Sequence, residues 1–534
     1  MFNFCLDNYR KFVNDITIGN TDEQLLAIIS TLGTNPKEDK KIRIYLERED
    51  QSKNVIGRCI LGCLAYNGIG GKKDYKQTFY LMENAAKEGV SKAKFVLGQM
   101  YFGGVFVQKD LSKAKTYFED VAKDGNIEAK IYLGEYYYKG ICCERDVQKA
   151  FEIFNSPYCH ENAIAQNNLG KMYFNGEYVE KDINRAITYF NKSAAHGYPE
   201  ALYRLGNLYF KGEYLKKDLR KAVDCYSKSS AGGYAEAQFE LGFMYDTGQF
   251  LPLNHRQAFE LYKLSAAQGH PLAQYNLARM YYTGESVKRN TKLAVEWTKK
   301  AAEGNEPEAQ FHLGVFYLSG ECIQQDYNLA FEWMQKAALQ GSIDALVELS
   351  ILYYHGVGTE QDYKKSIECL EKAASANSIR GKFLLGLNYF MGKCVEKDYK
   401  KSFELIQQAA LDGYPAAQSK LATMYFNGQG VAKDYKKALE WAEKAAPEDK
   451  MALFNIGSIY FNGAGVEKNY KVAFDIFSQL AKEEFPEAIF YLSMMYTNGF
   501  HVKQDEDRAI KLLKKAAKLG YKPAVDILHE LNER

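Results

Sequence analysis

Aspartate or asparagine recurs at a fixed spacing along the chain, and a regular row of carboxylates and amides is a pattern that can bind calcium or other hard cations. The thirteen residues are Asp74, Asp110, Asp146, Asp182, Asp218, Asn254, Asn290, Asp326, Asp362, Asp398, Asp434, Asn469 and Asp505. Each one precedes a segment with helical apolar periodicity, and Asp and Asn are the strongest helix N-caps. We therefore interpret the row as thirteen helix starts.

Histidine and cysteine, the usual ligands of softer metals, are scattered. The eight histidines include His255, His312 and His355, which stand in different repeats, and Cys59 with Cys63 is the only pair of thiols four residues apart. No HExxH zinc motif, phosphate-binding loop, G-x-S-x-G nucleophile elbow or CxxC pair is present. The sequence predicts no catalytic residue, no metal site and no cofactor.

The row of Asp and Asn reflects a repeat of 36 residues that runs through the sequence. Each copy has a small residue, numbered zero below, and six residues later a glycine in all thirteen copies. The small residues are Gly62, Gly98, Gly134, Gly170, Gly206, Gly242, Ala278, Gly314, Ser350, Gly386, Ala422, Gly457 and Ser493. The glycines are Gly68, Gly104, Gly140, Gly176, Gly212, Gly248, Gly284, Gly320, Gly356, Gly392, Gly428, Gly463 and Gly499.

Each repeat reads as two helices. Apolar residues at positions −5, −3, −1, +2, +3 and +4 form one arc of a first helix, which ends at the invariant glycine. The second helix begins after the Asp or Asn. A single hairpin cannot bury its apolar arc, so the hairpins must stack and the stack must be capped at both ends.

This pattern predicts an all-α fold, a right-handed α-solenoid of about 13 helix-turn-helix repeats. Three regions follow from it: an N-terminal helical cap with a degenerate repeat over residues 1–51, the repeats over residues 52–520, and a C-terminal capping helix over residues 521–534.

The repeat resembles the SEL-like repeat, a family of α-solenoids related to tetratricopeptide repeats. The residues that carry the resemblance are Ala129 to Gly140, Asp146 to Ala150, and Lys336 to Ala338 with Gly341. Members of this family typically act as adaptors that assemble protein complexes, so the resemblance implies an interaction function. A secreted bacterial branch ties each hairpin with a disulfide, which needs two cysteines at constant positions in every repeat, and this chain departs from that pattern.

The ten cysteines are not paired within repeats, which favours free thiols in a reducing compartment. Residues 1–20 show no secretory signal, and no apolar run approaches the length of a membrane span. Lys and Arg number 69 against 67 Asp and Glu, whereas nucleic-acid-binding domains usually carry a basic excess. We expect a cytoplasmic protein that binds no nucleic acid.

If the first helices line the concave side, as in related solenoids, positions −6, −2, +1 and +5 face a groove. These positions vary most between repeats, as a ligand surface on a fixed scaffold would, although a solvated surface would vary too. One polar segment suits the backbone and carboxylates of an extended peptide. It consists of Asn168, Lys171, Asn175, Arg204, Asn207, Lys211, Asn276 and Arg279.

A second segment has apolar residues at the same positions, which suggests a contact surface. It consists of Val315, Ile351, Leu384, Leu387 and Met391, with His312 and His355 beside them. The alternative is that superhelical curvature buries these positions against the next turn.

The sequence thus predicts a non-catalytic adaptor or scaffold that binds a protein or an extended peptide segment in its groove. The alternative from another class is a regulatory or immunity-type subunit that wraps around one partner enzyme and controls it.

Overall fold

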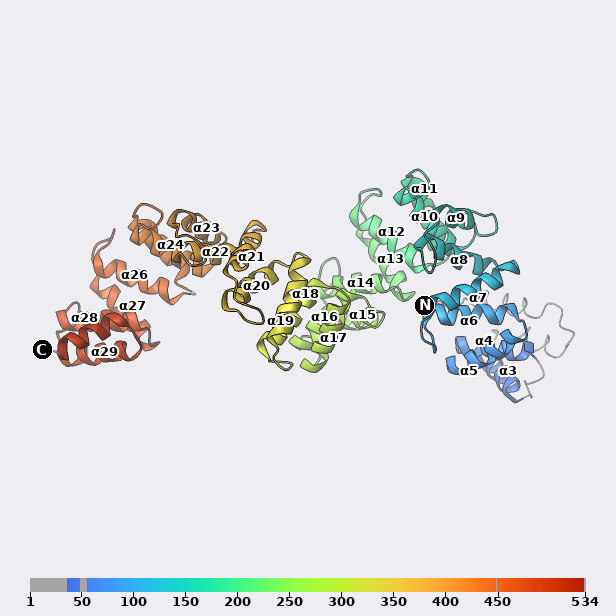
Figure 1. Ribbon diagram of the computed structural model, residues 1–534, viewed down its shortest axis with the longest axis horizontal. Coiled ribbons are helices and arrows are strands. Elements are labelled where there is room, and N and C mark those ends of the chain that lie inside the picture. Colours follow the sequence, from blue (N-terminus) through green and yellow to red (C-terminus); the bar gives the residue numbers. More distant parts are fainter. Residues whose placement is uncertain (1–35, 49–54, 448, 533–534) are drawn as a thin grey trace. The chain divides into compact units, whose positions relative to one another are not determined.

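The computed structural model describes residues 36–48, 55–447 and 449–532. Within these residues the chain forms 28 α-helices and no strand, and each helix lies next to its neighbours in sequence as the paired helices of consecutive hairpins (Figure 1). None of these helices has the length and apolar character that crossing a bilayer requires. The α-solenoid predicted from the sequence is confirmed.

The first helix of each repeat ends one residue before the invariant glycine. The thirteen first helices are α4 (Val55–Asn67), α6 (Ser91–Gly103), α8 (Ile127–Lys139), α10 (Ala163–Asn175), α12 (Pro199–Lys211), α14 (Ala235–Thr247), α16 (Pro271–Thr283), α18 (Pro307–Ser319), α20 (Ile343–His355), α22 (Ile379–Met391), α24 (Pro415–Asn427), α26 (Lys450–Asn462) and α28 (Pro486–Asn498). All thirteen glycines have φ between 67° and 76°. This left-handed conformation is strained for residues that carry a Cβ atom, which explains why glycine is invariant.

The second helix of each repeat begins directly after the Asp or Asn. These helices are α5 (Tyr75–Lys87), α7 (Leu111–Lys123), α9 (Val147–Phe154), α11 (Ile183–Ala195), α13 (Leu219–Ala231), α15 (His255–Ala267), α17 (Thr291–Glu303), α19 (Tyr327–Leu339), α21 (Tyr363–Ser375), α23 (Tyr399–Leu411), α25 (Tyr435–Ala445), α27 (Tyr470–Lys482) and α29 (Glu506–Lys518). In all thirteen the Asp or Asn side chain accepts a hydrogen bond from a backbone N–H of the first turn, so the capping interpretation is confirmed.

Two further helices flank the repeats. Helix α3 (Pro36–Arg48) precedes them, and α30 (Lys522–Asn532) follows within the predicted C-terminal cap. The rest of the predicted N-terminal cap, residues 1–35 and 49–51, lies outside the described residues, as do residues 533–534.

The N-caps allow a first prediction. The Asp182 carboxylate accepts a hydrogen bond from Arg185 N at 2.9 Å. Replacing Asp182 with Ala should lower the free energy of unfolding by about 1 kcal/mol, because the first turn of α11 loses its cap. Urea unfolding, with amide exchange in α11, measures the effect. Asp182→Asn keeps an acceptor and serves as the control, so an equal loss in both variants would contradict the capping role.

The small position sets how closely the two helices of a hairpin approach. A Cβ atom added at Gly98, Gly134, Gly170, Gly206 or Gly457 would lie only 2.6–2.8 Å from an aromatic ring of the second helix. That ring belongs to the residue twenty positions later. Where the small position is Ala278 or Ala422, the corresponding residue is Thr298 or Ala442. The two positions therefore compensate in volume, as close packing of the core requires.

Two compact units divide the chain. The first comprises residues up to Ala273 together with Glu285–Val287, and the second comprises Gln274–Gly284 together with the residues from Lys288 onward. Helix α16 is therefore shared between them.

Candidate functional site

Neighbouring first helices contact each other through positions +1 and −2. Three hydrogen bonds show the pattern: Gln99 Nε2 to Tyr132 Oη at 3.3 Å, Asn168 Nδ2 to Glu135 Oε1 at 3.4 Å, and Asn455 Nδ2 to Thr423 Oγ1 at 3.2 Å. In each pair the +1 residue of one repeat meets the −2 residue of the next. Together with position +5, these residues form what we call the first-helix face.

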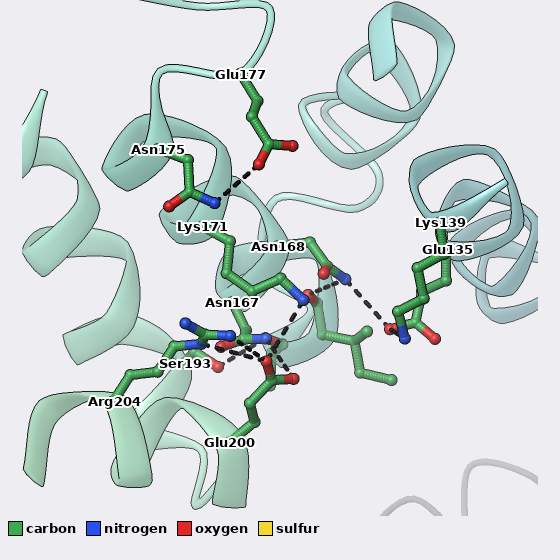
Figure 2. A network of polar contacts seen from close by, with 12 residues as sticks. Glu135, Lys139, Asn167, Asn168, Lys171, Asn175, Glu177, Ser193, Glu200 and Arg204 are labelled. Atoms are coloured by element: carbon green, nitrogen blue, oxygen red, sulfur yellow. Dashed lines mark hydrogen bonds and ion pairs between the residues drawn. The ribbon is translucent and has the colours of Figure 1, made fainter. Parts of the chain in front are cut away.

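In the first unit this face contains a buried polar network around Glu200 of α12 (Figure 2). The Glu200 carboxylate accepts hydrogen bonds from Asn167 Nδ2 at 3.0 Å and from Arg204 Nη2 at 2.8 Å. Lys171 Nζ lies 3.4 Å from the same carboxylate. On the other side of α10, the Asn168 amide donates to Glu135. The network thus joins α8, α10 and α12.

Burial and charge act in opposite directions on this network. Burial raises the pKa of Glu200, but the charges of Lys171 and Arg204 outweigh burial and leave that pKa below its ordinary value. Burial also lowers the pKa of Lys171, which makes Glu200 the partner that keeps its ammonium charged. Each of the two charges therefore favours the ionised form of the other, as expected for buried opposite charges.

The network changes the interpretation of two predicted groove residues. Asn168 is fully buried and Lys171 is 8% exposed. Their partners are side chains of the adjacent first helices, so what encloses them is the neighbouring repeats and not a further turn of the superhelix. Both residues hold the stack together and offer little surface to a ligand.

Other residues of the predicted polar segment line an open pocket of about 160 Å³ in the first unit. Arg204, Asn207 and Lys211 all belong to α12 and occupy positions −2, +1 and +5. The wall is completed by Phe174, Phe190, Leu208, Glu213 and Tyr214. The pocket therefore combines cationic and amide groups with aromatic surface.

A second pocket, of about 230 Å³, lies on the first-helix face of the second unit. It contains five residues of the predicted apolar segment, namely Ile351, His355, Leu384, Leu387 and Met391. Helices α20 and α22 supply them, and Met391 is 48% exposed. The remaining lining consists of Ser350, Tyr354, Ser366, Leu370 and Asn388.

The two pockets occupy the same place in the repeat. Five repeats separate Phe174 from Tyr354, Phe190 from Leu370, Arg204 from Leu384, Asn207 from Leu387, Leu208 from Asn388, and Lys211 from Met391. The scaffold thus forms one kind of pocket twice, and side chains at positions −2, +1 and +5 give it a cationic lining in one unit and an apolar lining in the other.

The family model of the Sel1 repeat matches thirteen segments of the chain between residues 57 and 521. The segments are residues 57–90, 91–126, 127–156, 163–198, 199–234, 235–270, 271–306, 307–342, 343–378, 380–414, 415–446, 450–484 and 486–521. The chain belongs to the Sel1 repeat family.

Solved structures of other repeat proteins resemble this Sel1 repeat chain. A protective antigen present in uropathogenic Escherichia coli strains, which displays an SLR fold, is 27% identical with a TM-score of 0.56, and the match covers 84% of this chain and 96% of that one. A Sel1 repeat protein from Oxalobacter formigenes is 29% identical with a TM-score of 0.41, covering 46% and 96%. An immunity protein from Pseudomonas aeruginosa is 20% identical with a TM-score of 0.27, covering 41% and 83%. A comparison with curated proteins found no match.

The remaining predicted residues line neither of the two pockets. Asn175 donates a hydrogen bond to Glu177 at 2.8 Å. Asn276 and Arg279 lie in the second unit, half-buried on α16. His312 stacks on Tyr275 with ring centroids 5.6 Å apart, and burial lowers the pKa of His312.

Val315 packs against the core of its own Sel1 repeat and the next one. The residues of the polar segment are thus not brought together: some line a pocket, some belong to the buried network, and two lie in the other unit. Most residues of the apolar segment line one pocket.

Sequence reasoning missed the residues that form the floor of each pocket. Phe174 and Tyr354 stand at position +4, and Phe190 and Leu370 belong to the second helices. Position +4 was assigned to the apolar arc of the first helix, and the second-helix position of Phe190 and Leu370 was not considered. The signal that could have found them is the repeat itself, since each pocket lies where two consecutive first helices meet the second helix between them.

The structure also assembles an ionisable cluster that the sequence prediction did not anticipate. His255 Nδ1 lies 3.0 Å from Asp246 Oδ1, and His255 Nε2 lies 3.5 Å from Glu285 Oε1. Among the described residues this is the group of His, Cys, Asp or Glu whose ligand atoms converge. Each ring nitrogen faces a different carboxylate, so the imidazole bridges two acidic groups, and a single metal ion would have to displace one of these contacts.

This cluster replaces an aromatic contact of other Sel1 repeats. Position +4 and the first residue of the second helix elsewhere form edge-to-face ring pairs, such as Phe390 with Tyr399 and Phe426 with Tyr435, with centroids 5.2 and 5.3 Å apart. In the sixth repeat Asp246 and His255 occupy these positions. An acidic residue in an otherwise largely aromatic column was the signal available in the sequence.

Proposed function

We propose that the chain is a non-catalytic scaffold that holds an extended segment of a partner protein along its first-helix face. The observation that carries the proposal is the recurrence of one pocket with two different linings, one around Arg204, Asn207 and Lys211 and the other around Leu384, Leu387 and Met391. Sel1 repeats typically serve as non-catalytic interaction modules. A fixed scaffold with variable linings is what a recognition surface needs.

The chemistry of each lining suits a different part of a polypeptide. Lys211 is exposed beside the aromatic wall, and Arg204 and Asn207 are half-buried next to it. Cationic and amide donors of this kind bind carboxylates and backbone carbonyl groups. The second pocket, with its leucine and isoleucine side chains, suits an apolar side chain, and even a cavity of about 150 Å³ can accommodate a benzene ring.

Affinity capture with the full-length chain tests this function. In the variant carrying Leu384→Ser and Met391→Ser, the apolar pocket loses its lining, and we expect captured partners that occupy this pocket to fall at least tenfold, measured by quantitative mass spectrometry. The variant Leu411→Ser is the matched control, because Leu411 is 68% exposed on the second helix α23 and lines neither pocket.

The two variants separate binding from folding. Thermal unfolding checks that both variants are folded at the temperature of capture. Met391 and Leu411 are exposed, and only the loss of the half-buried Leu384 side chain should lower the melting temperature, by a few degrees. Equal capture by the pocket variant, the control and the wild type would refute the apolar pocket as a binding site. Capture of one enzyme at fixed stoichiometry would favour the alternative, a regulatory or immunity-type subunit.

We also propose a cytoplasmic location. The nine described cysteines are free thiols, which suits a reducing compartment. Fractionation of native cells tests this assignment.

A further inference from the structure

Lys420 of α24 lies beside the apolar pocket of the second unit, and it forms no ion pair with a carboxylate among the described residues. Its Nζ lies 3.3 Å from the centroid of the Phe390 ring, and the side chain is half-buried. Burial lowers the pKa of Lys420 to about 8. The ring face partly stabilises the ammonium, but a carboxylate would stabilise it more.

Lys420 stands at a position of the repeat that lines the pockets elsewhere in the chain. It occupies position −2, the position of Arg204 in the first unit and of Leu384 in the preceding repeat. Arg204 is neutralised by Glu200 within its own helix. The residue that corresponds to Glu200 in the eleventh repeat is Ala416, so Lys420 lacks the equivalent carboxylate.

Lys420 lies next to the pocket lining. Its partner Phe390 directly precedes Met391, and both Phe390 and Leu387 pack against the same core cluster. By the pattern of the first-helix face, a residue at −2 also meets the +1 residue of the preceding helix, which here is Leu387 of the pocket. An apolar cavity and an uncompensated cation are therefore adjacent on consecutive first helices.

We infer that the second unit recognises a partner segment that carries an apolar side chain and, three residues away, an aspartate or glutamate. The apolar side chain occupies the pocket of Leu384, Leu387 and Met391, and the carboxylate pairs with Lys420. The inference rests on the function proposed above, and it adds the chemistry and the spacing of the partner.

The spacing follows from the geometry of the two chains. Packed helices lie 8–10 Å apart. A polyproline-II segment rises about 3.1 Å per residue and has three residues per turn, so side chains three apart point the same way about 9 Å apart. A β-strand would instead place side chains of one face at about 7 or 13 Å. The pocket opens between α20 and α22, and Lys420 reaches from α24 to the Phe390 ring of α22, so the two groups are about one helix spacing apart. An extended segment of polyproline-II type presents two side chains at about this spacing.

Synthetic peptide pools test the inference directly. Each nonapeptide carries a fixed Leu, a Glu three positions before or after it, and Ala, Ser, Thr or Pro elsewhere. Matched pools carry Gln instead of Glu, and a further pool moves the Glu to two positions away. Affinity for the full-length chain is measured by fluorescence polarisation at pH 7 and pH 9.5, with the wild type, Lys420→Met and Lys420→Arg.

At pH 7 the wild type should bind the better of the two Glu pools about five- to tenfold more tightly than its Gln counterpart. The preference should shrink toward unity at pH 9.5, because the ammonium of Lys420 is lost as the pH rises through about 8. Lys420→Arg should keep the preference at pH 9.5, since a guanidinium stays charged. Lys420→Met should lose it at both pH values while its thermal unfolding stays unchanged.

The experiment distinguishes failure of the inference about Lys420 from failure of the proposed function. If the wild type binds the Leu-containing pools through the pocket but treats Glu and Gln alike, the inference about Lys420 is wrong and the proposed function stands. If no Leu-containing pool binds, or if Leu384→Ser with Met391→Ser leaves binding unchanged, the pocket is not a peptide site and both are overturned.

Discussion

Replacing Gly170 with Val is expected to lower the free energy of unfolding by about 3 kcal/mol. A Cβ atom at Gly170 would lie 2.6 Å from the Phe190 ring, which is 1% exposed and packs in the core cluster of its hairpin. Helices α10 and α11 would have to separate, and the neighbouring repeats that stack on them would be disturbed as well. Urea unfolding followed by circular dichroism measures the total effect, and hydrogen exchange locates it.

A double-mutant cycle shows whether the loss arises from this contact. Phe190→Ala alone should cost about 3–4 kcal/mol because it opens a cavity. Combined with Gly170→Val it should cost about as much as either change alone, because the valine fills space that the ring has left. The chain already contains such a combination: Ala422 replaces glycine at the small position, and the residue that faces it, Ala442, is smaller than a ring. Additive losses in the double variant would show that volume complementarity is not the cause.

Replacing Glu200 with Gln should destabilise the first unit by about 3 kcal/mol, because the variant leaves the Lys171 ammonium buried without a counter-charge. The side chains of Lys171 and Glu200 are 9% and 18% exposed, so solvent screens the pair weakly. The measurement is urea unfolding at pH 7, together with exchange of the amides in α10 and α12.

Two further measurements check this assignment. Adding Lys171→Met to Glu200→Gln should restore part of the loss, because the double variant no longer buries an unpaired charge. The pH dependence has a defined sign as well. Since the pKa of Glu200 is depressed in the folded chain, its contribution is complete above the unfolded pKa of about 4.3 and is lost as the pH falls through the folded value. Glu200→Gln should therefore flatten the acid limb of the stability profile, and an unchanged limb would contradict the network.

The sequence was sufficient for everything that repeats. Thirteen copies of each column average out local exceptions, so the invariant glycine and the Asp or Asn before each second helix could be assigned to helix ends, and the structure confirms both. Of the four columns predicted to face a groove, position −6 lines neither pocket. Positions −2, +1 and +5 do line the two pockets, as Arg204 and Leu384 illustrate.

What the sequence could not predict depends on single repeats and their neighbours. Lys171 stands at a position predicted to face a groove. The sequence does not show that it is buried against Glu200 of the next repeat, where the pair stabilises the stack. His255 looked isolated because Asp246 and Glu285 come from other parts of the repeat pair. Lys420 lay outside the two segments that the sequence singled out, and only the structure shows that its Nζ lies over the Phe390 ring beside the pocket.

The equivalence of the two pockets has a consequence for how such a chain can change. The small position and the residue that faces it hold each hairpin together, whereas the pocket residues that differ most between the two units stand at positions −2, +1 and +5. Substitutions at these three positions can therefore change the pocket lining at a smaller cost in stability. Arg204 and Leu384 both stand at position −2 of their repeats, but one side chain is cationic and the other is apolar. Lys171 is an exception among residues at position +1. It pairs with Glu200, so replacing either residue alone would leave an unpaired buried charge. The pocket lining can therefore differ from one hairpin to another wherever its residues make no buried contact with a neighbouring repeat.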